Sequence, residues 1–220
     1  MKLKSSFKAM VASAAFALGC ATAPAEATLI LQTGLVGGSG DVDNVIFNAC
    51  GTSSGPSTLI QGCLNTNHST LVNFTGNEAL GVPAGGQARI VGADGAFDAI
   101  SIALADPLLG FGKLQFNLDA VADGTATFKA IDQFGNEFDF ANVALSGNGE
   151  NKFTLYSLDD QVAVSFSLVS TVAIQNISDL EQVRLGPTTI TVAQVPEPGS
   201  LALLGVGLIG LAGIRRRSWR

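Results

Sequence analysis

The 220-residue sequence predicts an all-β domain, a jelly-roll-like β-sandwich, with an N-terminal signal helix and a C-terminal hydrophobic helix outside the domain. Three observations support this fold class. Apolar and polar residues alternate with a period of two, and turn-forming residues recur about every eight to twelve positions. The central part of the chain also lacks an apolar stripe of helical spacing. The whole chain has 13 phenylalanines, which are available to fill a core between two sheets.

Alternation is clearest in the middle and later parts of the chain. The alternating segments are residues 97–104, 113–118, 125–131 and 162–168. The segments between them carry Gly, Asn and Asp, at residues 122–124, 134–136, 146–149 and 158–160. These residue types form tight turns between antiparallel strands. We therefore expect about ten strands of this kind.

The first third of the domain, residues 28–83, is richer in Gly, Ser, Thr and Asn. It still contains two strand-like pieces, residues 44–48 and 70–74. It could form a separate subdomain, or it could supply edge strands and long loops to the same sandwich. We favour the second interpretation, because neither piece could bury a core alone.

The N-terminus has the pattern of a secretory signal peptide, which we assign to residues 1–27. Lys2, Lys4 and Lys8 precede an apolar stretch over 9–19, and small residues follow up to Ala27. An alternative is a lipoprotein signal at residues 17–20, which would acylate Cys20 and retain the protein on a membrane.

Residues 28–194 form the predicted domain and are acidic. They contain 16 Asp and Glu against five Lys and Arg, a formal charge of −11. Nucleic acid and anionic lipid are poor partners for such a surface. The length suits one domain with a sizeable core.

Cys50 and Cys63 are the two cysteines of this domain, and we expect them to form a disulfide, as paired cysteines in exported chains usually do. A zinc site is the alternative. It needs three or four ligands, whereas His68 is the only histidine of the chain.

The C-terminal segment, residues 195–220, combines three features in order. They are Val195-Pro196-Glu197-Pro198-Gly199, an apolar run over 199–214, and the cluster Arg215, Arg216 and Arg217. An apolar helix of this length spans about 24 Å, less than the roughly 30 Å hydrocarbon core of a bilayer. This order resembles the PEP-CTERM sorting signal of Gram-negative bacteria.

The resemblance implies an exported protein with the Sec translocon and an exosortase as partners. The C-terminal helix would anchor the chain transiently in the inner membrane, before cleavage sends the domain to the cell surface or the medium. The signal usually occurs in organisms that make extracellular polysaccharide, so we expect the protein to be associated with it. The alternative is a C-terminal anchor that is never cleaved. Residues 43–48, 70–77, 86–90 and 177–185 also resemble segments of exported PEP-CTERM proteins of this size, a resemblance that supplies no catalytic residue.

Catalytic residues are not predicted. A Ser or Cys nucleophile would need His68 as its base, and His68 lies in a polar stretch typical of a solvated loop. A glycosidase needs only two carboxylates, but Asp119, Asp159 and Asp160 lie at strand ends, where carboxylates commonly form turns. The expected function is a structural or interaction module. The alternative is a secreted carbohydrate-active enzyme or a carbohydrate-binding module.

Two ligand predictions complete the sequence reading. Asp41 and Asp43 alternate at a Gly-flanked entry to a strand, so they could hold calcium, although the pattern lacks the glycine and glutamate of an EF-hand. No other cofactor is predicted. The domain has no Trp and one Tyr, Tyr156, so a row of aromatic side chains for sugar stacking is not evident.

Overall fold

The computed structural model describes residues 28–190, apart from 39, 52–54, 84–87, 159–160 and 176–179. Within these ranges it contains twelve strands and no helix, which confirms the predicted all-β class. The two predicted terminal helices lie outside the described residues. In the part that is described, no helix has the length and apolar character needed to cross a membrane. The strands are β1 (Thr28–Thr33), β2 (Asp43–Ile46), β3 (Ser57–Leu64), β4 (Leu71–Gly81), β5 (Arg89–Gly92), β6 (Ala96–Leu104), β7 (Leu109–Leu118), β8 (Gly124–Asp132), β9 (Glu137–Leu145), β10 (Asn151–Leu158), β11 (Ala163–Gln175) and β12 (Leu180–Thr189).

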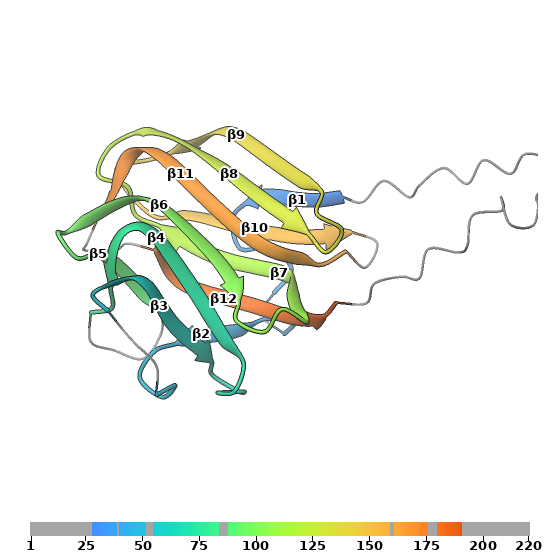
Figure 1. Cartoon of the computed structure of the whole chain (residues 1–220). Helices are drawn as coiled ribbons and strands as arrows, with labels where there is room; N and C mark the ends of the chain where they lie inside the picture. The colour runs from blue at the N-terminus through green and yellow to red at the C-terminus, as the bar shows by residue number, and fades with distance from the viewer. Residues whose placement is uncertain are drawn as a thin grey trace, which may run out of the picture.

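Seven of the strands close into a barrel in the order β7, β12, β2, β3, β4, β6, β11 and back to β7 (Figure 1). Two arms extend from this ring: β10 and then β1 continue from β7, and β8 and then β9 continue from β11. The short strand β5 pairs with both β4 and β12. A jelly-roll sandwich is not confirmed, because a sandwich has two separate sheets. Here β7 pairs with both β12 and β11, so the strands form one closed sheet.

The ring closes through a single residue pair between β7 and β11, Phe111 with Ala163. Gly110 makes this close approach possible. A Cβ atom at Gly110 would lie 2.3 Å from Val162 Cγ1 and 2.6 Å from the Ala163 carbonyl oxygen, both inside van der Waals contact. Glycine is therefore required where the two strands meet.

Four phenylalanine rings pack together where the two arms leave the ring. Phe116 on β7 and Phe153 on β10 meet Phe128 on β8 and Phe166 on β11, with ring centroids 5.0 to 5.9 Å apart. All four side chains are at most 1% exposed. Each buried ring contributes about 1.5–3 kcal/mol, so this cluster is a main source of the stability of the fold.

The first third of the domain belongs to the same core. Val45, Ile60 and Phe74 are fully buried and form one hydrophobic cluster with Phe116. The pieces expected as edge strands, residues 44–48 and 70–74, correspond to β2 and β4, which with β3 are members of the ring, and the edge strand from this third is β1 on β10.

The predicted disulfide is confirmed. Cys50, in the turn after β2, is bonded to Cys63 on β3, with a Cα–Cα distance of 5.6 Å. The bond ties Cys50, in the loop between β2 and β3, to Cys63, whose side chain is fully buried in the core.

Candidate functional site

The loop between β1 and β2 lies across the outer face of β7 and β10. Buried polar side chains of these strands hold it there. Gln115 Nε2 donates to the Val36 carbonyl at 3.0 Å, and Thr154 Oγ1 donates to the Gly34 carbonyl at 2.8 Å. The Val36 amide in turn donates to Thr154 Oγ1 at 3.0 Å. The main chain of this loop, rather than solvent, thus covers the polar side chains on this face of β7 and β10.

Lys113 on β7 is the charged centre of this region. Its side chain is 10% exposed, and its ammonium group lies 3.0 and 3.1 Å from the two carboxylate oxygens of Asp41. The carbonyls of Gly37 and Gly38 accept from the same ammonium at 3.2 and 3.3 Å. The hydrogen bond from Lys113 lowers the pKa of Asp41 below its ordinary value, so Asp41 is ionised at neutral pH.

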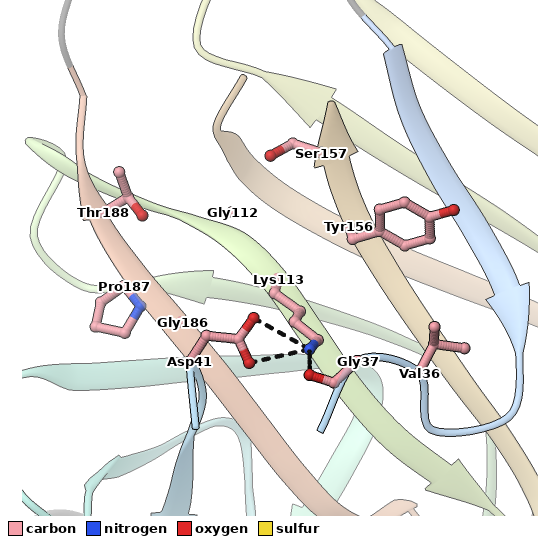
Figure 2. A pocket seen from close by; sticks show the side chains of 10 residues that line it. All are labelled: Val36, Gly37, Asp41, Gly112, Lys113, Tyr156, Ser157, Gly186, Pro187 and Thr188. Atoms are coloured by element: carbon pink, nitrogen blue, oxygen red, sulfur yellow. Dashed lines mark hydrogen bonds and ion pairs between the residues drawn. The ribbon is translucent and has the colours of Figure 1, made fainter. Parts of the chain in front are cut away.

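A pocket of about 420 Å³ opens beside this ion pair (Figure 2). Four segments line it: Val36, Gly37 and Asp41 from the loop, Gly112 and Lys113 from β7, Tyr156 and Ser157 from β10, and Gly186, Pro187 and Thr188 from β12. Figure 2 places Tyr156 and Val36 on one side of Lys113 and Thr188 and Pro187 on the other. The lining thus includes Tyr156, Ser157, Thr188 and one carboxylate, and Figure 2 shows Tyr156 and Ser157 pointing to opposite sides of β10.

Two glycines shape the pocket in different ways. A Cβ atom at Gly112 would lie 3.6 Å from both Ser157 Oγ and Thr188 Oγ1, so the glycine leaves the space between the two hydroxyls open. At Gly186 a Cβ atom would lie 2.5 Å from the Asp41 carbonyl oxygen. Gly186 is therefore needed for the loop to lie on the sheet, whereas Gly112 has room for a larger residue.

Asp41 and Asp43, the predicted calcium ligands, line a second hollow of about 350 Å³ together. Both carboxylates already have protein partners there: Asp41 pairs with Lys113, and Asp43 Oδ2 accepts from the amide and hydroxyl of Thr66 at 2.7 and 2.6 Å. In the described ranges, no three His, Cys, Asp or Glu side chains gather as a possible metal site. Calcium at Asp41 and Asp43 stays a prediction.

The remaining predicted residues are not part of the pocket. His68 is exposed between β3 and β4, as expected of a loop residue. Asp119 follows β7, where a turn-forming carboxylate was expected. Asp159 and Asp160 lie outside the described residues, as do all members of the sorting motif from Val195 to Arg217.

One buried carboxylate has a structural role that sequence reasoning missed. Asp132, at the end of β8, is 1% exposed and accepts hydrogen bonds from the amides of Phe134 and Asn136 and from Gln161 Nε2. It fixes the turn between β8 and β9. The Asp-Gln-Phe-Gly-Asn order of residues 132–136 could have indicated an Asx turn.

An acidic cluster, defined here as Glu78, Asp94 and Asp98, lies between the ends of β4 and β6. Partial burial, together with the charges of Asp94 and Asp98, raises the pKa of Glu78. Asn77 Nδ2 donates to Asp98 at 2.8 Å. The cluster does not contribute to either hollow described above.

Comparison with known families identifies the C-terminal segment. Residues 194–217 match the PEP-CTERM protein-sorting motif. The chain carries a PEP-CTERM sorting signal. This signal implies an exported protein that is processed by an exosortase, which confirms the resemblance noted from Val195 to Gly199 and from Arg215 to Arg217. No curated protein and no solved structure matches the chain, so the comparisons offer no relative of the β domain.

Proposed function

We propose that this PEP-CTERM protein is a non-catalytic structural or interaction module of the cell surface or extracellular matrix, associated with exopolysaccharide. Residues 1–27 direct export as a signal peptide. The apolar run over 199–214 anchors the chain in the inner membrane until an exosortase cleaves it. The observation that carries the proposal is the sorting motif at residues 194–217, which begins shortly after the last strand of the domain ends at Thr189.

The chemistry of the pocket supports a binding role over a catalytic one. Asp41 is the carboxylate in its lining, and the pKa of Asp41 is lowered by the hydrogen bond from Lys113. An ionised carboxylate that is already paired with an ammonium group is a poor general acid. A glycosidase of the usual kind needs a second carboxyl group that stays protonated near neutral pH.

The alternative of a carbohydrate-active enzyme draws its best support from the acidic cluster. Glu78 has a raised pKa and two carboxylate neighbours, as glycosidase acids often do. However, Asp94 and Asp98 are both exposed. Catalysis by carboxylates profits from a site that excludes water, so we prefer the non-catalytic function.

The experiment compares release from cells of the wild type and of a variant with Pro196, Glu197 and Pro198 all replaced by alanine. We expect the wild type in the matrix fraction and the variant in the inner-membrane fraction, because the variant lacks the recognised motif. A matched control carries Thr191→Ala, Val192→Ala and Ser218→Ala, three changes outside residues 194–217. Normal release of the motif variant would contradict the sorting role. Equal recovery of the wild type from the matrix fraction of cells that make no exopolysaccharide would contradict the association.

A further inference from the structure

The pocket beside Lys113 presents groups that recognise hydroxyl-rich molecules. Tyr156, Ser157 and Thr188 bring hydroxyls that can both donate and accept, and the Asp41 side chain is 61% exposed despite its ion pair. A carboxylate with open lone pairs accepts strong, charge-assisted hydrogen bonds from ligand hydroxyls. The volume of about 420 Å³ lies within the range of ligand pockets, roughly 300–1,000 Å³.

The charges around the pocket favour a neutral ligand over an anionic one. The Lys113 ammonium already has four oxygen neighbours within 3.3 Å, so it has no proton left for a ligand carboxylate or sulfate. The domain as a whole carries a formal charge of −11, which repels anions at a distance.

Tyr156 supplies the aromatic surface that the sequence did not lead us to expect. It is the only tyrosine of the chain, and it lies directly opposite Lys113 in the pairing of β10 with β7. Its half-buried ring lines the pocket next to Val36 (Figure 2). A ring with an apolar face and a polar tip suits the face of a sugar, which carries C–H groups between its hydroxyls.

We propose that this pocket is a binding subsite for one unit of a neutral polysaccharide, with Tyr156 against the sugar face and Asp41 as a hydrogen-bond partner of its hydroxyls. This assignment rests on the proposed function as a matrix protein and gives it a ligand class. Gly112 leaves a methyl-sized gap in the pocket lining between the Ser157 and Thr188 hydroxyls.

The test uses the full chain with Trp219→Phe, purified in a detergent without a sugar headgroup. Tyr156 is then the only Tyr or Trp, so tyrosine emission reports on the pocket alone. The probes are cellohexaose, mannohexaose and maltohexaose as neutral oligosaccharides and oligogalacturonate as the anionic one. We expect at least one neutral probe to change the emission saturably and oligogalacturonate to bind more weakly or not at all. Tighter binding of oligogalacturonate, or no response to any neutral probe, would overturn the assignment.

Two variants locate the binding, with calorimetry as the readout. Gly112→Ala places a methyl group 3.6 Å from both hydroxyls without a clash, so the fold is kept while the pocket is narrowed. We expect its Kd to rise about threefold to tenfold, and that of Tyr156→Ala to rise similarly through lost stacking. Gly81→Ala on β4 is the matched control, since its new Cβ atom would lie 3.9 Å from Val91 Cγ2 and neither residue lines the pocket. Unchanged affinity in both pocket variants would place the ligand elsewhere.

These results are separable from those of the proposed function. Recovery of the wild type from the matrix fraction, without oligosaccharide binding in solution, would reject this subsite and leave the proposed function intact. Oligosaccharide binding by a protein that never reaches the matrix fraction would support the subsite and reject the proposed association.

Discussion

Opening the Cys50–Cys63 disulfide is expected to destabilise the folded domain by about 3 kcal/mol. The two cysteines are 13 positions apart, so the bond closes a ring of about 14 residues. A bond that closes such a ring lowers the entropy of the unfolded chain, which is the main source of the stabilisation. In a domain of this size, each kcal/mol shifts the melting temperature by about 2–4 °C, so reduction should lower it by about 6–12 °C.

The assay is a thermal melt of the secreted form, which has lost Cys20 with residues 1–27, with and without reductant, together with alkylation of free thiols. We expect no alkylation before reduction and two alkylated thiols afterwards. The protein should stay folded at room temperature, because typical domains have about 5–15 kcal/mol of stability. A Cys50→Ala, Cys63→Ala double variant should melt low in both buffers and show no response to reductant. Alkylation of the untreated protein, or a shift under about 2 °C on complete reduction, would refute the reasoning.

Three further predictions concern the ring, the acidic cluster and the second hollow. Gly110→Ala should lower the free energy of unfolding by about 1–3 kcal/mol, because its Cβ atom would lie 2.6 Å from the Ala163 carbonyl oxygen. Gly112→Ala on the same strand should not destabilise the domain. Equal denaturation midpoints for the two variants would contradict the close contact at Gly110. Glu78→Gln should raise the melting temperature at pH 7, because burial and its acidic neighbours raise the pKa of Glu78 and make its ionised form unfavourable in the folded state. The gain should vanish as the pH falls below the ordinary value of 4.5, where Glu78 is protonated in both states, and a gain that persists at low pH would count against this cause. If calcium binds at Asp41 and Asp43, a chelator should lower the melting temperature of the wild type but not that of Asp43→Asn. An unchanged midpoint would remove calcium from the account and leave the two carboxylates with their protein partners alone.

The strands were predictable because alternation is a local property. The alternating residues 97–104 correspond to β6 at Ala96–Leu104, and the turn residues 134–136 lie between β8 and β9. The partners of each strand were not predictable in this way. Alternation indicates which side chains share a face, but the closure of the ring depends on Gly110, whose neighbours Val162 and Ala163 lie far along the chain.

The pocket was missed for a related reason. Lys113 and Gln115 alternate with apolar residues, a pattern typical of a solvated strand face. Their partners in the loop after β1 lie 72 to 79 positions away, so no local signal indicated that the face is covered. Tyr156 was noted only as a lone aromatic residue, and its position opposite Lys113 follows from the pairing of β10 with β7.

The end of β12 constrains the order of events during export. Its last residue, Thr189, precedes the sorting motif at residue 194 by five positions, and a chain of that length reaches at most about 17 Å. Pro187 and Thr188, on the rim of the pocket, belong to the same strand end. A protease bound to the motif would therefore act close to the pocket, and a polymer held in the pocket would lie near the protease. We expect the domain to bind a polymer after its release, when the protease no longer competes for this space.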